Sequence, residues 1–305
     1  MDMLTEKAII EILKNLDPHS TYISAKDVKD MNEPLNGNFE GIGVQFNLLR
    51  DSIIVIEPIE GGPSEKAGIR AGDRIITIDK EKVTGIKMTT AGVRTRLMGA
   101  KGTKVDLIIY RKGEKAPLDF IIIRDKIPIV SLDASYMLDK ETGYIKLNKF
   151  AATTEKEFSD AVAVLKKSNM QNLVLDLRGN GGGYMQAATE LADKFFADQK
   201  LLVYLKGRKT PRQDFKSRGS GSLSSARVVV LTDEGSASAS EILAGALQDW
   251  DRAIILGRRT FGKGLVQTGF YLTDCSMIRF PISRYFPPTA NSIPRPYPVV
   301  YSHYI

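Results

Sequence analysis

The feature that most limits the fold is an alternation of short apolar runs and amphipathic stretches in the second half of the chain. The predicted strands are 143–147, 173–177, 228–231 and 253–256, and the predicted helices are 155–167, 186–196 and 240–250. Strands that alternate with helices form a mainly parallel sheet covered by those helices, and functional groups gather where strands lead into helices. Residues 126–305 are therefore predicted to form a layered α/β domain.

The first part of the chain follows a different pattern. Residues 39–124 carry short β-type runs separated by Gly, Pro and Asp clusters, with one helical stretch at 89–98. This pattern predicts a small, mainly antiparallel β module at 38–125. Residues 1–37 are predicted to form a helix followed by turn residues. The polar, Gly/Ser-rich segment 207–226 has no periodicity and predicts either a plain surface loop or a lid over a site.

The composition is that of an ordinary globular protein, with 305 residues, 43% hydrophobic and 26% charged. No apolar run approaches the ~18 to 20 residues that cross a bilayer. The net charge is +7, but the basic residues are spread along the chain. The densest basic group, at 208–218, favours a solvated loop over a contact with a polyanion or a membrane surface. The lone Cys275 allows no intramolecular disulfide.

A candidate nucleophile lies in segment 234–242, where small residues separate a strand from a helix. Ser238 is predicted at the helix N-terminus, where free N–H groups and the helix dipole favour developing negative charge. The spacing from Ser238 to Glu241 also fits a capping box, in which the serine only satisfies a backbone donor. This segment alone leaves both interpretations open.

A serine nucleophile needs a base, and neither histidine is well placed for that role. His19 precedes the β module, and His303 lies near the end of the chain. Lys263, flanked by glycines before a strand, is the nearest lysine after Ser238, and it can act as a base only if burial lowers its pKa. Gln267 lies on the same side of that strand, so its amide could hold the ammonium without adding charge. A loop lysine and a solvated glutamine are the alternative.

A third element, residues 176–183, also leads from a strand into a helix and ends in three glycines. Glycines permit a nest of backbone N–H groups around an oxyanion, and one of these could act together with the N–H of Ala239. A phosphate or dinucleotide cradle is less well supported, because no Lys-Ser/Thr pair follows and Tyr184 replaces the third glycine of the fingerprint. No His, Cys or carboxylate set has metal-ligand spacing. The sequence therefore predicts no metal and no cofactor.

Taken in order, these segments resemble the carboxyl-terminal processing, or tail-specific, serine peptidases over nearly the whole chain. The stretches that resemble the family's N-terminal signature and its PDZ domain are residues 16–22, 41–44 and 63–75. The stretches that resemble its catalytic signatures are residues 176–183, 235–242 and 262–267. Their ordered combination is far more specific than any single motif.

The resemblance implies an α/β serine-protease core of the crotonase/ClpP-like kind, with an inserted, mainly β PDZ domain and an N-terminal helical segment. The implied nucleophile, general base and orienting partner are Ser238, Lys263 and Gln267. The implied oxyanion donors are Gly182 and Ala239. The PDZ domain is expected to bind a substrate's free C-terminus by β-augmentation, with the carboxylate on the backbone N–H groups of Gly41, Ile42, Gly43 and Val44.

The enzyme so implied is a serine endopeptidase that works through an acyl-enzyme on protein or peptide substrates with free, apolar C-termini. The resemblance further implies action in the periplasm or cell envelope, leaves room for a homo-oligomer, and gives no reason to expect a nucleic-acid partner. The chain starts at the late N-terminal helix of such enzymes without an export signal, so a processed or truncated form is expected.

Two alternatives remain open. One is a non-catalytic adaptor whose PDZ domain binds peptide tails, and the joint presence of Ser238, Lys263 and Gln267 argues against it. The other is a hydrolase with Cys275 as nucleophile, which the lack of a histidine in the surrounding sequence disfavours.

Overall fold

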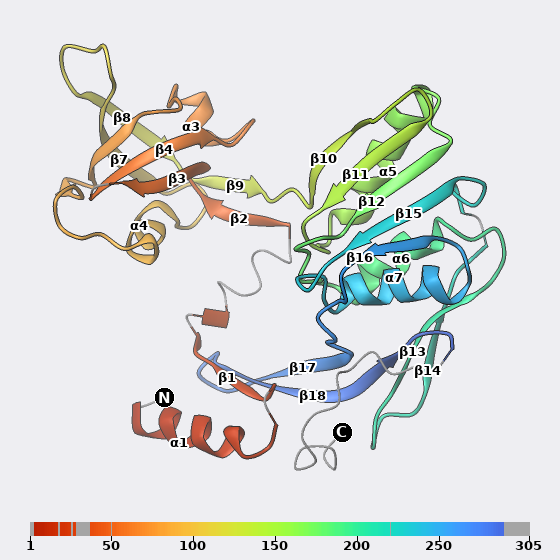
Figure 1. The fold of residues 1–305 in the computed structure, drawn as a ribbon. Helices are drawn as coiled ribbons and strands as arrows, with labels where there is room; N and C mark the ends of the chain where they lie inside the picture. Colours follow the sequence, from red (N-terminus) through yellow and green to blue (C-terminus); the bar gives the residue numbers. More distant parts are fainter. Residues whose placement is uncertain are drawn as a thin grey trace. The chain divides into compact units, whose positions relative to one another are not determined.

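The computed structural model describes residues 3–17, 19–25, 27–28, 37–49, 51–219 and 221–289. The chain divides into two compact units, one formed by residues 1–37 with 130–305 and the other by residues 38–129. Figure 1 traces both units along the chain. The N-terminal residues thus belong to the same unit as the C-terminal half of the chain.

The inserted unit, residues 38–129, is built mainly from antiparallel strands. β2 (Asn38–Gly41) pairs with β9 (Asp125–Pro128) where the chain enters and leaves the unit. A six-stranded sheet has the order β3-β4-β5-β7-β8, with β6 beside β5. Its strands are β3 (Val44–Leu49), β4 (Ser52–Pro58), β5 (Arg74–Ile78), β6 (Glu81–Lys82), β7 (Lys104–Tyr110) and β8 (Leu118–Ile123).

Two helices complete this unit, α3 (Pro63–Lys66) and α4 (Thr90–Leu97). The Thr89 hydroxyl accepts a hydrogen bond from the N–H of Gly92 and caps α4. Strand alternation turns every second side chain of β7 inward, which forms a core with the buried side chains of β4 and β5.

The larger unit contains a five-stranded sheet with the order β10-β11-β12-β15-β16. The strands are β10 (Leu132–Met137), β11 (Thr142–Leu147), β12 (Asn172–Asp176), β15 (Arg227–Thr232) and β16 (Ile254–Gly257). The last four are parallel, and β10 joins the edge antiparallel to β11. The helices α5 (Thr154–Lys167), α6 (Met185–Asp193) and α7 (Ala239–Asp249) pack against this sheet and share one apolar core with it (Figure 1). The predicted α/β fold class is confirmed.

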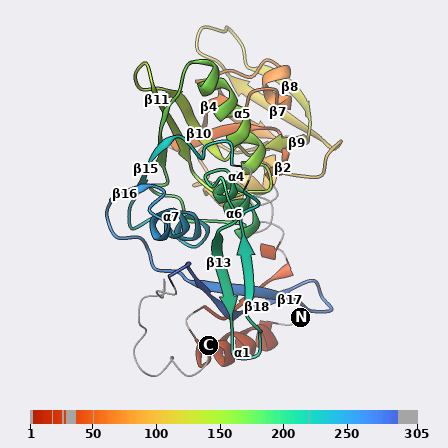
Figure 2. The same ribbon diagram turned by 90° about the vertical axis from the view of Figure 1, so that its right-hand side faces the viewer.

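A second sheet of the larger unit is antiparallel throughout. It contains β1 (Thr21–Ile23), β13 (Leu201–Lys206), β14 (Gln213–Lys216), β17 (Leu265–Tyr271) and β18 (Met277–Phe286). Helix α7 contacts both β13 of this sheet and β16 of the first, so it lies between the two sheets (Figure 2).

Two sequence-based expectations for this sheet were incomplete. Residues 1–37 contain α1 (Met3–Lys14) as expected, but the following residues include the strand β1. Segment 207–226 was expected to be without regular structure, yet β14 lies within it and pairs with β13. Both strands are too short to show a periodic pattern in the sequence. They form because β18 and β13 pair with them.

No helix in the described parts of the chain has the length and apolar character needed to span a membrane.

Candidate active site

Ser238 lies in the loop between β15 and α7, immediately before the first residue of the helix. Its backbone has φ 56° and ψ −110°, a left-handed conformation that costs a side-chain-bearing residue about 1–3 kcal/mol. Its side chain is only 9% exposed. Such a conformation persists only where surrounding contacts enforce it, so the direction of the Ser238 side chain is fixed at the positive end of α7.

The main enforcing contact comes from Glu241, a carboxylate that is 4% exposed. Its Oε2 accepts hydrogen bonds from the backbone N–H groups of Ser238, at 2.8 Å, and Lys263, at 2.9 Å. Its Oε1 accepts from the N–H of Gly262 and the hydroxyl of Thr260, both at 2.7 Å. The half of the expected capping box in which the Glu241 carboxylate accepts from the Ser238 N–H is therefore present. The same carboxylate also joins the Ser238 loop to the Lys263 loop.

Lys263 is half-buried in the loop that leads into β17. Burial lowers the pKa of its ammonium, and the positive charge of Arg279 lowers it further. A lowered pKa increases the fraction of neutral amine available at a given pH. This property is what a lysine base beside a serine requires.

Tyr285, on β18, is a neighbour of Ser238 that sequence reasoning gave no role. The side chain is 6% exposed and belongs to the same apolar core as α7. Burial raises the pKa of its phenol, and a hydrogen bond with the Ser238 side chain acts in the opposite direction. Its N–H donates to the carbonyl of Gly264 at 2.9 Å, next to Lys263. The residue looked like an ordinary buried strand tyrosine, and no local pattern distinguishes it.

Gln267, on β17, donates a hydrogen bond from Nε2 to the backbone carbonyl of His19 at 2.9 Å. A segment from the start of the chain therefore reaches this site through the backbone of His19, and the expectation that His19 is not placed to act as the base stays a prediction. Burial lowers the pKa of the His19 imidazole, Lys263 and Arg279 lower it further, and Asp17 acts in the opposite direction. The expected contact of Gln267 with Lys263 stays a prediction. His303 lies outside the described residues.

The candidate oxyanion residues lie against the Ser238 loop. Gly182 has φ 95°, and a Cβ placed there would be 2.6 Å from the carbonyl oxygen of Ala237 and 2.9 Å from the nitrogen of Ala239, so only glycine fits. The N–H of Gly182 donates to Oδ1 of Asn180 at 2.9 Å. Ala239 is the first residue of α7, and its N–H has no acceptor within the helix. Of the two predicted donors, Ala239 is the more directly available one.

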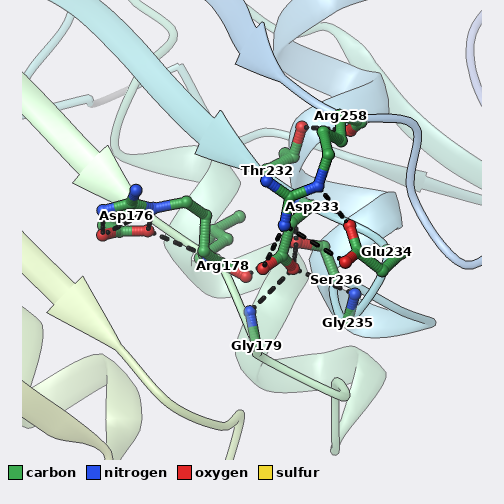
Figure 3. Close-up of polar contacts among 10 residues, drawn as sticks. Asp176, Arg178, Gly179, Thr232, Asp233, Glu234, Gly235, Ser236 and Arg258 are labelled. Carbon is green, nitrogen blue, oxygen red and sulfur yellow. Dashed lines mark hydrogen bonds and ion pairs between the residues drawn. The ribbon is translucent and has the colours of Figure 1, made fainter.

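Asp233 joins the glycine-rich loop to the Ser238 loop. Its Oδ1 accepts from the N–H groups of Gly179 at 2.8 Å and Gly235 at 2.9 Å, as Figure 3 shows. In the same view, Arg258 pairs with Glu234 beside Asp233. The two loops that bear the predicted nucleophile and oxyanion donors are therefore held in one framework of backbone hydrogen bonds.

The start of the glycine-rich loop is fixed as well. The side chain of Arg178 folds back onto Asp176, the fully buried last residue of β12 (Figure 3). The Tyr144 hydroxyl donates to the same carboxylate at 2.7 Å. Further along, the Asn180 carbonyl accepts from the N–H of Ala237 at 3.0 Å.

The predicted peptide-binding loop, Gly41, Ile42, Gly43 and Val44, lies in the inserted unit at the start of β3. The carbonyl of Ile42 accepts from the N–H of Ser64, and that of Gly43 accepts from the N–H of Ile59, both at 3.0 Å. Among the described strands, β3 pairs with β4 alone, so its other edge is open. An open edge presents backbone N–H and C=O groups that can receive another strand.

The described residues hold no group of three or more His, Cys, Asp or Glu side chains that could bind a metal ion. Cys275, the alternative nucleophile, is exposed in the turn between β17 and β18. Its backbone φ is 67°, and its N–H donates to the carbonyl of Leu272 at 3.0 Å. The contacts of Cys275 are those of a tight hairpin turn.

Comparison with known proteins decides the family. Residues 141–297 match Peptidase family S41, and residues 41–122 match the PDZ domain. A carboxy-terminal-processing protease of Bartonella bacilliformis is 38% identical over 301 residues, which are 95% of this chain and 67% of that protein. The chain belongs to peptidase family S41. The carboxy-terminal processing protease CtpA of Bacillus subtilis is 35% identical to this S41 chain, over 93% of it and 60% of CtpA.

Solved structures agree with the S41 assignment. A photosystem II D1 C-terminal processing protease superposes with a TM-score of 0.58 at 31% identity, over 96% of this chain and 80% of that one. An S41 protease from Bacteroides fragilis shares the fold, with a TM-score of 0.55 at 18% identity over 90% of this chain and 76% of that one. The family and the PDZ domain inferred from the sequence motifs are confirmed. The chain spans about two thirds or less of the curated relatives described above.

Proposed function

We propose that this S41 chain is a serine endopeptidase in which Ser238 is the nucleophile and Lys263 is the general base. The observation that carries the proposal is the Glu241 carboxylate, which binds the backbones of both residues through one oxygen atom. The strained backbone of Ser238 at a helix N-terminus and the lowered pKa of Lys263 support the same assignment.

In the proposed reaction, neutral Lys263 takes the proton of the Ser238 hydroxyl as Oγ attacks the substrate carbonyl carbon. The resulting ammonium gives that proton to the leaving amine, which leaves an acyl-enzyme. Lys263 then takes a proton from water as the water oxygen attacks the ester carbonyl carbon, and it returns that proton to Ser238 Oγ as the ester bond breaks and the acid is released. The N–H of Ala239 and the N–H of Gly182 are proposed to stabilise the oxyanion in both halves. For that purpose the N–H of Gly182 has to exchange its present acceptor, Asn180, for the substrate oxygen.

The PDZ domain is proposed to bind the free C-terminus of a protein substrate. A tail added to the open edge of β3 gains backbone hydrogen bonds from that strand. Val44, Phe46 and Leu48 of β3 are half-buried and pack against the core of the domain, which favours apolar tail residues. Action in the periplasm or cell envelope is proposed from the family resemblance.

The test is cleavage of an unstructured protein with an apolar free C-terminus by the parent chain, Ser238→Ala and Lys263→Ala. Cleavage by the parent alone is the expected result. A matched substrate with an amidated C-terminus separates the two parts of the proposal, because it removes the carboxylate that the PDZ domain is proposed to bind. Tail binding by the parent without any cleavage contradicts the endopeptidase and favours a peptide-binding adaptor.

A further inference from the structure

The turn formed by Asp17, His19 and Ser20 reaches the proposed active site from outside the stretch that matches family S41. Asp17 is 6% exposed, and its Oδ1 accepts from the N–H groups of His19 at 2.7 Å and Ser20 at 2.8 Å. Its other oxygen accepts from the Ser20 hydroxyl. A buried carboxylate with three donors fixes the backbone of the turn, because each donor left unpaired has a desolvation cost of about 1–3 kcal/mol.

The strand that follows the turn fixes it in register with the rest of the site. In the β1–β18 ladder, Thr21 lies opposite Arg279 and Tyr22 opposite Ile278. On its other side, β18 pairs with β17, the strand that carries Gln267. A slip of one residue in the β1 ladder turns every β1 side chain to the opposite face and moves the His19 carbonyl away from Gln267. The sheet therefore specifies which carbonyl meets this amide.

The contact between His19 and Gln267 determines which way the amide faces. A glutamine amide has a donor end, Nε2, and an acceptor end, Oε1, and a carbonyl can bind only the donor end. With Nε2 held on the His19 carbonyl at 2.9 Å, the acceptor end is the one left for a neighbouring cation. A lysine ammonium has three donors and no acceptor, so it can be held by Oε1 and is repelled by an NH₂ group.

We propose that the Asp17–Ser20 turn is a positioning element of the active site, which holds Gln267 through the His19 carbonyl so that its acceptor end serves Lys263. This inference rests on the proposed role of Lys263 as general base. In it, Asp17 and His19 are positioning residues, since they act on the reaction only through Gln267.

The charges around the turn agree with this role. The groups facing the His19 imidazole are Asp17 in the same turn, Lys263 in the loop before β17, and Arg279 on β18. Burial and the two cations lower the pKa of His19 below its ordinary value, although Asp17 opposes them. The lowered pKa favours the uncharged imidazole, and the hydrogen-bond acceptor that the turn supplies to Gln267 is a backbone carbonyl, which carries no charge.

The decisive experiment is a double-mutant cycle between Asp17→Ala and Gln267→Ala in the full chain, with kcat, KM and the pH profile of kcat measured for each variant. Asp17→Ala is expected to lower kcat about 10- to 100-fold with KM within about twofold, because small misplacements of catalytic groups have effects of this size. In the Gln267→Ala background the same change is expected to have little further effect on kcat. Additive losses in the two backgrounds would overturn the proposal.

Two further variants separate positioning from folding. Asp17→Asn keeps an oxygen that can accept from both backbone N–H groups, so it is expected to restore most of the kcat lost in Asp17→Ala. Asp27→Ala removes an exposed aspartate from the same N-terminal segment and is expected to leave kcat unchanged. Failure of Asp17→Asn to restore kcat, at an unchanged melting temperature, contradicts the role assigned to the turn.

A measurement without substrate distinguishes failure of this inference from failure of the proposed function. The side-chain amide of Gln267 is followed by NMR in the parent chain and in Asp17→Ala. Slowed hydrogen exchange at Nε2 in the parent and its loss in Asp17→Ala are expected, whether or not the chain cleaves peptides. Identical exchange in both proteins would overturn the positioning contact. An inactive parent with the NMR result intact would instead contradict the peptidase assignment.

Discussion

The backbone N–H of Lys263 donates a hydrogen bond to Oε2 of Glu241 at 2.9 Å, so the lysine loop is bound to the first turn of α7. The same oxygen accepts from the N–H of Ser238. The separation of the two loops is therefore set by one buried side chain of a regular helix, which is more rigid than a loop.

Glu241→Gln tests this arrangement. The amide keeps one acceptor oxygen and turns an NH₂ group toward N–H donors, so at least one buried donor loses its partner. The free energy of unfolding is expected to fall by about 1–3 kcal/mol and kcat by about 10- to 100-fold. Denaturant unfolding and steady-state kinetics measure both. Glu155→Gln on α5, where the carboxylate pairs with Lys194 near the surface, is the control expected to change little.

Lys263→Met is expected to remove activity and to stabilise the fold. The native pKa of Lys263 lies below its unfolded value of 10.5, so between these two values the unfolded chain binds more protons and stability rises with pH. At neutral pH the half-buried ammonium therefore opposes folding, and replacing it with an apolar side chain relieves that cost. A loss of kcat of at least about 10²-fold with a higher melting temperature is expected. A lower melting temperature, or activity in Lys263→Arg, contradicts the assignment.

The pH dependence of kcat is expected to follow the deprotonation of Lys263, rising with pH to a plateau with a midpoint below 10.5. Arg279→Gln removes the cation that helps to lower this pKa, so the rising limb is expected to move to higher pH and activity near neutral pH to fall. The control is Arg212→Gln, on the β13–β14 hairpin, which is expected to leave the midpoint of the pH profile unchanged. If the midpoint is also unchanged in Arg279→Gln, the charge of Arg279 does not lower the pKa of Lys263.

Gly182→Ala is expected to abolish cleavage and to destabilise the fold by about 1–3 kcal/mol, since its Cβ meets the Ala237 carbonyl at 2.6 Å in a left-handed backbone conformation. Gly181→Ala is a matched control, because a Cβ at Gly181 meets no atom within 4 Å. Kinetics and thermal unfolding of both variants are the measurement. Equal effects of the two substitutions would show that the glycine run is needed only for flexibility.

The sequence predicted the parts of this fold that carry their own periodicity. The strand predicted at 173–177 overlaps β12 and is offset from it by one residue, and the helix predicted at 155–167 begins one residue after the start of α5. Strands such as β1 and β14 carry no such signal, because three or four residues become a strand only beside a partner. The contact of Gln267 with His19 joins residues that are 248 positions apart, so no local sequence pattern can predict it.

For the candidate site, the sequence indicated separate loops without showing how they are joined. The small residues around Ser238 and the glycines around Lys263 identified two loops, and the spacing to Glu241 left capping and catalysis as competing interpretations. The structure shows that capping by Glu241 also binds the second loop, so the two interpretations do not compete. Tyr285 was not singled out, because what distinguishes it is its hydrogen bond with the Ser238 side chain in the folded chain and not a feature of the nearby sequence.

The ladder between β1 and β18 also bears on the order of events during synthesis. Thr21 leaves the ribosome far earlier than its partner Arg279, and β1 has no strand to join until that partner is made. Ser238 is synthesised 41 residues before Arg279, so the loop that carries it exists before β18 can pair with β1. The pairing of β1 with β18 and the contact of Gln267 with the His19 carbonyl can therefore form only after residue 279 has been synthesised, so this part of the candidate site is completed later than the loop that carries Ser238.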